Sequence, residues 1–306
     1  MDKAKKIILV VSATGVQGRV VVNTLLQNGF NVRIFVRNPD SPVAQELIKA
    51  GAEPVKGDLK DPASLEAAVE GVDVVYSILP FDDPTLELNG GLALIKAALK
   101  ANVQQFVHAS VSNAGTHTSF PRWGTGYWNE PYWTTKWAIE EAIHKAGFPY
   151  WTILKPVAFM ENYISGLADI VCPKFKEGKL ITAQDPTKKW DLVTVEDTAK
   201  FALEAIKDRE RFNKKSIEIA SDSLTNDEVA AVFTKVLGKK FEAVSLSLEE
   251  AVQNGLHPMI VRTNEWSNET GGYFVADKEA LKEYKIPLTS FEEWVTKHKD
   301  EFKVKF

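Results

Sequence analysis

IILVVSATGVQG, residues 7 to 18, is the stretch that decides the fold. Its first five residues, Ile7 to Val11, form a continuous aliphatic run, which is typical of a buried parallel strand. Mostly small residues follow as far as Gly18, and a helical pattern then extends from Arg19 to Gln27. We therefore expect a strand, a tight turn and a helix. The free amides at the N-terminus of that helix, together with its dipole, favour a phosphate group on the turn.

The turn departs at one position from the G-x-x-G-x-x-G pattern of dinucleotide-binding proteins. Ser12 stands where that pattern has its first glycine, whereas Gly15 and Gly18 keep the other two. Taken alone, the turn therefore fits an ordinary strand-to-helix connection as well as it fits a cofactor site. In the cofactor interpretation, the pyrophosphate contacts are Ser12, Thr14, Gly15, Val16, Gln17 and Gly18.

The composition argues against several classes of protein. The 306 residues carry 37 Lys and Arg against 41 Asp and Glu, with no basic run, so we expect no direct nucleic-acid partner. Cys172 is the single cysteine, which excludes an internal disulfide. No apolar run is long enough to span a bilayer, and the first residues lack the features of a signal peptide. These features predict a cytoplasmic protein with no membrane partner.

Strand-like runs alternate with helical patterns along the first half of the chain. This alternation predicts βαβ units, and hence an α/β fold with a Rossmann-type doubly wound parallel sheet. We assign residues 1–156 to an NAD(P)-binding Rossmann domain, with a strand near 216–220 returning to its sheet. Residues 157–306 are expected to form a smaller, mostly helical substrate-binding lobe. The expected helices include one from about Gly90 to Lys100 and one near Met160 to Val171.

The residue at the end of the second strand bears on the choice of nicotinamide cofactor. Dinucleotide folds commonly hold an acidic residue there, which binds the 2'-hydroxyl of the adenosine ribose. This chain has Arg37 instead, and a planar guanidinium can bind a 2'-phosphate with two hydrogen bonds. The sequence therefore favours NADPH over NADH. The alternative is an arginine that is merely solvated.

Further candidate cofactor contacts come at the ends of other strands, because ligands of such sheets bind there. Asp58 follows the third strand and can accept a hydrogen bond from the adenine amino group, while Leu59 packs on the ring. Capping of the next helix is an equally good role for Asp58. Leu79 ends the fourth strand and Ser110 follows the fifth, and we include both in the cofactor site.

Lys136 occupies a position where a lysine is unexpected. At helical spacing it shares a face with Tyr132, Ile139 and Ile143, and this apolar face should pack on the sheet. A lysine there must extend to solvent or meet a polar partner. The hydroxyls of a nicotinamide ribose would be suitable partners, so we predict that Lys136 is both catalytic and cofactor-binding. Tyr132 is the candidate proton donor, and its closeness to Pro131 leaves its direction open.

Aromatic residues gather after the fifth strand. Five of the eight tryptophans lie between residues 123 and 151, and those on the loop beside Gly124 and Gly126 can wall a pocket for a flat or apolar substrate. Core or surface anchoring is the alternative. The five histidines show no metal-ligand spacing, so we expect no metal. No G-x-S-x-G motif is present, which argues against a hydrolase.

Several short motifs follow one another along the chain. They are Ser12–Gly18, Arg37-Asn38-Pro39, Val55–Asp58, Lys136 with Glu140, Tyr150–Pro156 leading to Phe159-Met160-Glu161-Asn162, Trp190–Ala199 and Gly272–Asp277. As an ordered set they resemble the NmrA-like family of atypical short-chain dehydrogenases/reductases, and the likeness spans nearly the whole chain. The resemblance implies a Rossmann-type domain that binds NADP, and it adds Pro156, Phe159 and Asn162 to the cofactor contacts. Ser12 and the tryptophan-rich loop differ from the family pattern.

The resemblance leaves two functions open. Some members reduce quinones, aldehydes or phenylpropanoid double bonds, and others are redox-sensing regulators that bind the dinucleotide without turning it over. Lys136 matches the lysine that the enzymes keep, whereas the family often lacks a tyrosine at the position of Tyr132. We expect an NADPH-dependent oxidoreductase that reduces a carbonyl, quinone or conjugated double bond of a small apolar or aromatic substrate. The alternative is a non-catalytic sensor that signals redox state to a protein partner, and epimerase or isomerase chemistry also stays open.

Overall fold

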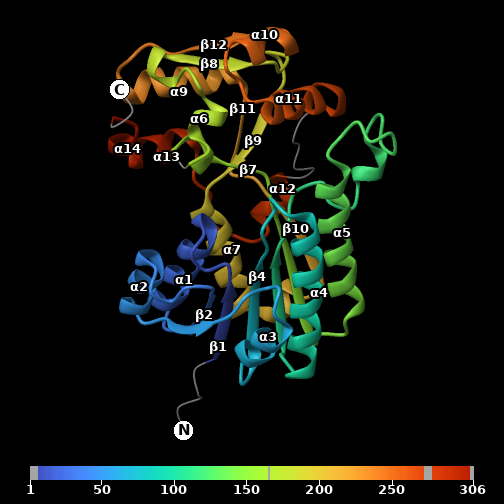
Figure 1. Ribbon diagram of the computed structural model, residues 1–306. Helices are drawn as coiled ribbons and strands as arrows, with labels where there is room; N and C mark the ends of the chain where they lie inside the picture. The colour runs from blue at the N-terminus through green and yellow to red at the C-terminus, as the bar shows by residue number, and fades with distance from the viewer. Residues whose placement is uncertain (1–5, 165, 272–277, 304–306) are drawn as a thin grey trace. The chain divides into compact units, whose positions relative to one another are not determined.

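The computed structural model describes residues 6–164, 166–271 and 278–303 (Figure 1). The motif Gly272–Asp277 lies outside these ranges. The described residues form two compact units. Unit 1 takes its residues from Met1–Ser119, Trp123–Lys155 and Thr198–Glu218, and unit 2 takes its residues from Phe120–Arg122, Pro156–Asp197 and Ile219–Phe306.

A seven-stranded sheet forms the centre of unit 1, in the order β10-β6-β5-β4-β1-β2-β3. The five pairings from β3 to β6 are parallel. The strand order reverses at β1, and ligands of such sheets bind at the carboxyl ends of the strands beside that reversal. The strands are β1 (Ile7–Val11), β2 (Asn31–Val36), β3 (Glu53–Lys56), β4 (Val74–Ile78), β5 (Gln105–Ala109), β6 (Tyr150–Pro156) and β10 (Lys215–Ile219).

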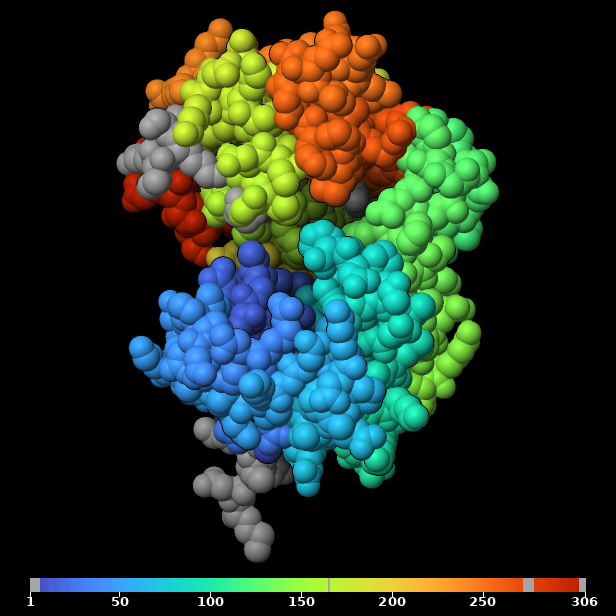
Figure 2. All heavy atoms as spheres, viewed as in Figure 1, coloured from blue at the N-terminus to red at the C-terminus, as the bar shows by residue number. Residues whose placement is uncertain are grey.

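Helices flank the sheet of unit 1 (Figure 1). Three of them begin at a strong local signal: the side chains of Ser41, Asp61 and Asp83 each accept a hydrogen bond from a first-turn amide, and each of these residues is followed by proline. The helices are α1 (Val16–Gln27), α2 (Pro42–Lys49), α3 (Pro62–Val69), α4 (Pro84–Lys100), α5 (Glu130–Lys145), α7 (Val195–Lys207) and α8 (Arg209–Phe212), with a 3-10 turn η1 (His117–Ser119). In Figure 2 the segments from α1 to α4, blue to cyan, form one continuous surface.

Unit 2 has a small sheet in the order β11-β9-β7 and a parallel pair, β12 with β8. Aromatic side chains fill its core, where Phe233 contacts Phe175, Phe291 and Phe302 with ring centroids 5.1 to 5.3 Å apart. The strands are β7 (Ala158–Phe159), β8 (Lys179–Thr182), β9 (Trp190–Val193), β11 (Asp222–Leu224) and β12 (Glu242–Ser245). The helices are η2 (Met160–Tyr163), α6 (Ala168–Val171), η3 (Phe175–Glu177), α9 (Asn226–Leu237), α10 (Leu248–Gln253), α11 (Pro258–Thr270), α12 (Lys278–Lys282), α13 (Phe291–Lys297) and α14 (Lys299–Lys303).

Two expected helices differ from the structure. Helix α4 begins at Pro84 rather than near Gly90, because Asp83 caps it and Pro84 fits the first helical position. The two glycines lie inside α4, where a Cβ on Gly91 would sit 2.8 Å from a methyl group of Leu79. The single helix expected from Met160 to Val171 is wrong, since only the short segments η2 and α6 form there.

No helix in the described part of the chain is both long enough and apolar enough to cross a membrane.

Candidate functional site

The turn after β1 has a backbone that glycine would adopt freely. Ser12 has φ of 55°, in the left-handed region, and its carbonyl accepts a hydrogen bond from the amide of Gly15 at 3.1 Å. The Ser12 hydroxyl donates to the carbonyl of Ile78 in β4 at 2.9 Å. The chain therefore makes the glycine-like bend with a serine and anchors it through the side chain.

Close packing at the turn explains the last glycine of the motif. A Cβ on Gly18 would lie 2.3 Å from the Ser12 carbonyl oxygen and 2.8 Å from the Cα of Ala13, so only glycine lets α1 approach β1 this closely. Gly15 is the N-cap of α1, and it supplies no side-chain hydrogen bond to the first turn. The first turn also carries no acidic residue, and Thr14, Gly15 and Val16 are exposed. The helix N-terminus is thus an open position for an anion.

Gln17 links the turn to the centre of the sheet. Its side-chain amide donates to the hydroxyl of Tyr76 in β4 at 3.3 Å. Tyr76 is fully buried, and burial raises its pKa far above the ordinary value, so this hydroxyl stays neutral.

The two arginines of the second strand region have different surroundings. Arg33 donates to the carbonyls of Ala68 and Glu70 at 3.0 and 2.7 Å and pairs with Glu53 at 3.3 Å. Arg37 is exposed just after β2, and its side chain forms no hydrogen bond or ion pair with any residue of the described ranges. Of these two arginines, Arg37 is therefore the one whose guanidinium is available to an outside anion.

Asp58 follows β3 and does not cap α3, because Asp61 does so. One Asp58 carboxylate oxygen accepts from the amide of Lys60 at 2.9 Å, which fixes the loop. Leu59 packs against α4, where a Cβ added to Gly90 would lie 3.0 Å from the Cβ of Leu59. The side chain of Asp58 thus stiffens the loop at the strand end and still has a second oxygen.

Lys136 lies on α5 and pairs with a residue that the sequence analysis did not single out. Its Nζ donates to Glu87 Oε1 of α4 at 2.7 Å, and the two side chains are 9% and 2% exposed. The other Glu87 oxygen, Oε2, is buried and has no hydrogen-bond partner among the described residues. Lys136 Nζ also lies 5.0 Å from the ring centroid of Tyr132, which is half-buried. The lysine therefore meets a polar partner within the protein instead of extending to solvent.

A neutral histidine lies on the strand beneath this pair. His108 of β5 is buried, and its Nδ1 is 3.3 Å from Ser77 Oγ on the neighbouring strand β4. Burial, followed by the positive charge of Lys136, lowers the pKa of His108 to about 3. His108 thus adds no positive charge next to Lys136 at neutral pH.

A second buried ion pair lies farther along α5. Lys155 of β6 pairs with Glu140 Oε2 at 3.2 Å and donates to the carbonyl of Ala114 at 2.5 Å. Ser110, placed in the cofactor site by the sequence, donates its hydroxyl to Glu140 Oε1. Burial raises the pKa of Glu140, and Lys155 and Ser110 oppose this shift. The pair holds the start of the loop that follows β5.

Leu79 and the aromatic residues that follow β5 are positioned by packing. Leu79 follows β4 and is buried, 7% exposed. On the tryptophan-rich loop, Trp128 is buried, as is Trp133 on α5, and His117 packs edge-on against Trp123 with centroids 4.8 Å apart.

The three candidate contacts drawn from the family resemblance lie in unit 2. Pro156 is the last residue of β6, Phe159 lies in β7, and Asn162 lies in η2. Phe159 and Asn162 are half-buried. Their part in a cofactor site stays a prediction.

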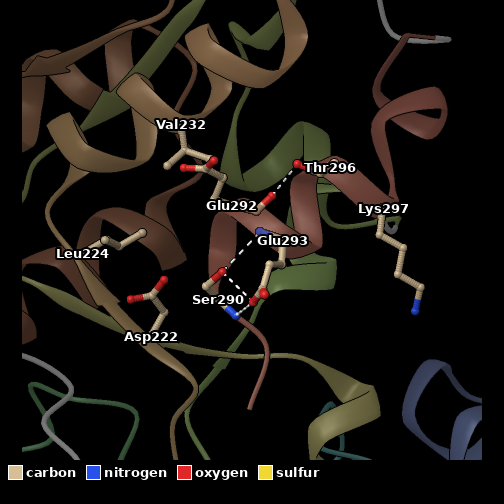
Figure 3. Close-up of a pocket in the computed structure, with 8 residues that line it drawn as sticks. All are labelled: Asp222, Leu224, Val232, Ser290, Glu292, Glu293, Thr296 and Lys297. Atoms are coloured by element: carbon tan, nitrogen blue, oxygen red, sulfur yellow. Dashed lines mark hydrogen bonds between the residues drawn. The ribbon is translucent and has the colours of Figure 1, made fainter. Parts of the chain in front are cut away.

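Unit 2 also has an open pocket of about 620 Å³ beside α13 (Figure 3). Its charged side chains are already engaged: Glu292 pairs with Lys235 at 2.7 Å, Lys297 pairs with Glu196 at 2.8 Å, and Glu293 caps α13 through Ser290. The pocket has no cluster suited to catalysis. Within the described ranges, no group of His, Cys, Asp and Glu side chains is arranged to hold a metal ion.

The sequence analysis missed Glu87 and Lys155. Glu87 was overlooked because the helix was expected to start near Gly90, after Glu87. The pair Asp83-Pro84 is nevertheless a helix-start signal. Lys155 is the last residue but one of the largely apolar strand β6, and a buried lysine at such a position needs a carboxylate partner.

The profile of the NmrA-like family matches residues 4–295 of this chain. The NmrA-like family domain-containing oxidoreductase malD of Malbranchea aurantiaca is 26% identical over 344 residues, which cover 97% of this chain and 98% of the relative.

Two solved structures share the fold. The NADPH-dependent quinone oxidoreductase QOR2 of Escherichia coli, complexed with NADPH, has a TM-score of 0.76 at 24% identity and covers 95% of this chain and 99% of its own. NmrA, a negative transcriptional regulator in complex with NADP, has a TM-score of 0.78 at 18% identity and covers 99% of this chain and 97% of its own. By its sequence and its fold, this chain belongs to the NmrA-like family.

Proposed function

We propose that this protein is an NADPH-dependent oxidoreductase that reduces a carbonyl, quinone or conjugated double bond of a small apolar or aromatic substrate. The observation that carries the proposal is the open N-terminus of α1, which lies at the end of the central strand in the same unit as Arg37, whose side chain has no partner in the described ranges. The relatives named oxidoreductases support the reaction class. NADPH, when bound, supplies a hydride.

The turn after β1 would hold the pyrophosphate. The exposed residues Thr14 and Val16, together with the dipole of the twelve-residue helix α1, offer backbone donors and partial positive charge without a side-chain cation, whereas the amide of Gly15 already donates to the Ser12 carbonyl. Because Ser12 already adopts a left-handed conformation, these donors need no rearrangement of the turn.

Arg37 would select NADPH, which carries a 2'-phosphate, over NADH. Its guanidinium is exposed at the end of β2 and is not engaged by any residue of the described ranges, unlike that of Arg33. A 2'-phosphate offers it two charge-assisted hydrogen bonds, and a 2'-hydroxyl offers at most one neutral acceptor.

Lys136 would orient the nicotinamide ribose and polarise the oxygen of the acceptor. Its ammonium group has three hydrogens, and Glu87 accepts one of them. Tyr132, whose ring lies next to the ammonium, or a water molecule would donate the proton that completes the reduction.

The first test compares cofactor affinities. Arg37→Gln should weaken NADPH binding by about ten- to a hundredfold, the range expected for a charge-assisted bond, and should leave NADH binding nearly unchanged. Titration of nicotinamide fluorescence measures both dissociation constants. Lys49→Gln, which removes an exposed cation at the end of α2, is the matched control. Equal loss for the two cofactors would show that Arg37 does not bind the 2'-phosphate.

The second test is turnover. Purified protein should oxidise NADPH in the presence of some members of a panel of quinones, aldehydes and enones, and Lys136→Ala should remove most of that rate. An unchanged rate in this variant would remove Lys136 from the reaction.

A redox-sensing regulator is the second candidate, and the fold shared with the regulator NmrA favours it. A sensor needs only the turn and Arg37. Tight NADPH binding without turnover on any acceptor, together with a protein partner whose binding depends on the cofactor, would select this alternative.

A further inference from the structure

The position of Glu87 suggests more than a structural ion pair. It lies in the first turn of α4, where the helix dipole stabilises a carboxylate, and it is 2% exposed. One of its oxygens accepts a hydrogen bond from the ammonium of Lys136, while the other is buried and has no partner in the part of the chain that the structure describes. A buried carboxylate oxygen without a donor is costly, and native proteins keep few of them.

The packing of α4 on α5 fixes this pair. The two helices lie side by side (Figure 1), and Gly91 on α4 allows the close approach. A Cβ at Gly91 would sit 2.8 Å from Leu79 and 3.2 Å from Ile139 of α5. Glu87 lies four residues before Gly91, on the same helix face, so the close approach brings its carboxylate to Lys136.

Glu87 is the ion-pair partner of Lys136 within the described ranges. The other titratable groups nearby are His108 of β5, which burial keeps neutral, and Tyr132 of α5, whose ring faces the ammonium. Burial raises the pKa of Glu87, and Lys136 opposes that shift. The charge and the direction of Lys136 therefore depend on Glu87.

We infer that Glu87 is a positioning residue for Lys136: it holds the ammonium charged and directed through Oε1, which leaves the remaining ammonium hydrogens for oxygen atoms of the nucleotide and the acceptor. This inference rests on the proposed function for its biological meaning. The dependence of Lys136 on Glu87 is a property of the protein itself and can be measured without turnover.

The decisive experiment is lysine NMR. Protein with ¹³C at the lysine ε-carbons is titrated with base, and the Lys136 signal is assigned by its absence in Lys136→Arg. Glu87→Gln keeps the size of the side chain and an acceptor oxygen but removes the charge. The midpoint of the Lys136 titration should fall by about one pH unit or more, because a buried ammonium loses its counter-charge.

A shorter side chain at position 87 and a control at another ion pair of α4 separate the effect of charge from that of side-chain length. Glu87→Asp keeps the charge and shortens the side chain, so the midpoint should stay within about half a unit of wild type while the position of the ammonium changes. Glu66→Gln is the matched control, since Glu66 pairs with Lys100 of the same helix α4 at the same 2.7 Å, but both side chains are exposed. It should leave the Lys136 midpoint unchanged.

Kinetics then test the positioning role. In an active enzyme, Glu87→Gln should lower kcat at least tenfold and move the alkaline limb of its pH profile to lower pH, with a change in KM for NADPH below about threefold. Glu87→Asp should lower kcat and keep the pH profile. A merely structural role would lower the melting temperature of both variants and move neither the Lys136 midpoint nor the pH profile, which would overturn the inference.

The two proposals fail separately. If wild-type protein turns over no acceptor, the reductase proposal is wrong and the NMR titration still decides the role of Glu87. If turnover is robust and the Lys136 midpoint in Glu87→Gln matches wild type, the reductase proposal stands and the role of Glu87 is wrong.

Discussion

Unit 1 and unit 2 bury their polar side chains in different ways. Near its strand ends unit 1 buries two ion pairs, Lys136 with Glu87 and Lys155 with Glu140. Within the described ranges Glu87 Oε2 accepts no hydrogen bond, whereas Glu140 Oε2 pairs with the ammonium of Lys155 at 3.2 Å. Unit 1 therefore holds two buried ion pairs, one of which has an unsatisfied carboxylate oxygen.

Unit 2 instead buries a neutral network where β8, α9 and α11 meet. Each of its five side chains bonds to at least one other member: Asn226 donates to Gln184 at 2.8 Å, Gln184 to Ser267 at 2.9 Å, and Thr182 to Asn264 at 3.1 Å. Thr182 also lies 3.4 Å from the Asn226 amide nitrogen, which joins the two halves of the network.

The difference teaches how to separate function from structure in this fold. A satisfied neutral network fixes elements to one another and offers nothing to a ligand. A buried ion pair with an unsatisfied oxygen can still interact with a bound ligand, but it contributes less to the stability of the fold. This criterion supports the proposal that the reaction takes place on unit 1.

The largest expected effect comes from breaking a charged pair. Glu140→Ala leaves Lys155 buried without a counter-charge, and should lower the free energy of unfolding by about 3–5 kcal/mol. Urea denaturation measures the loss, and hydrogen exchange at β6 locates it. Glu66→Ala, which breaks an exposed pair, should lose less than about 1 kcal/mol. Similar losses in both variants would contradict the comparison.

Breaking the neutral network should lower the free energy of unfolding less than Glu140→Ala does, and it should not affect cofactor binding. Asn226→Ala removes the bonds to Gln184 and Thr182 and should cost about 1–3 kcal/mol. NADPH affinity should not change. The exposed neighbour Asp227→Ala is the control, with an expected loss below about 1 kcal/mol. A loss of cofactor affinity in Asn226→Ala would place unit 2's network in the site.

Besides this network, unit 2 buries the carboxyls of Asp191, Asp197 and Glu161. Glu161 is held by neutral donors, Trp294 Nε1 and the amide of Val195, both at 3.2 Å. Burial, the largest cause, raises its pKa from 4.5 to about 7. Between these values the folded state binds a proton that the unfolded state has lost. Stability should therefore fall as pH rises from 4.5 to 7, by up to about 1.4 kcal/mol per pH unit, with no further change from this group above 7.

Glu161→Gln should remove this contribution. Its stability is compared with that of wild type by urea denaturation at several pH values, since the difference isolates Glu161 from the other raised carboxyls, Glu87 and Glu140. Parallel curves for the two proteins would show that Glu161 does not titrate in this range.

Ser12→Gly should have the smallest effect. Removing the left-handed strain of a non-glycine residue gains about 1–2 kcal/mol, whereas losing the hydroxyl bond to Ile78 costs about 0.5–1.5 kcal/mol and the freer unfolded chain costs about 0.4–1 kcal/mol. The net change should lie within about 1 kcal/mol, and NADPH affinity should change less than threefold because the bend is already glycine-like. A tenfold gain in affinity would show that Ser12 weakens cofactor binding.

Most of the fold could be predicted from the sequence because its signals are local. The aliphatic run Ile7 to Val11 forms strand β1, and the helix expected after the turn ends at Gln27, as α1 does. The start of α4 was missed, and with it Glu87. The helix expected at Met160 to Val171 was wrong because its apolar residues serve two short segments that pack separately into the core of unit 2.

The candidate site could be predicted only in part. Lys136 stands out because a lysine on an apolar helix face is locally anomalous. Its partner lies 49 residues away, and only the packing of α4 on α5 brings the two together. The φ angle of Ser12 is equally invisible to sequence, since serine adopts either sign when the surrounding backbone requires it.

The order of strands has a consequence for the synthesis of the protein. A ribosome delivers β6 long before β10, which completes the same sheet only after residues 157–214. Until then the carbonyl of Trp151 and the hydroxyl of Thr152 lack their later partners, the amide of Lys214 and the carbonyl of Phe212. The nascent chain therefore displays an open apolar strand edge, the kind of surface that aggregates or recruits chaperones. A fragment ending at Pro156 should aggregate, and joining residues 198–218 to it should restore solubility.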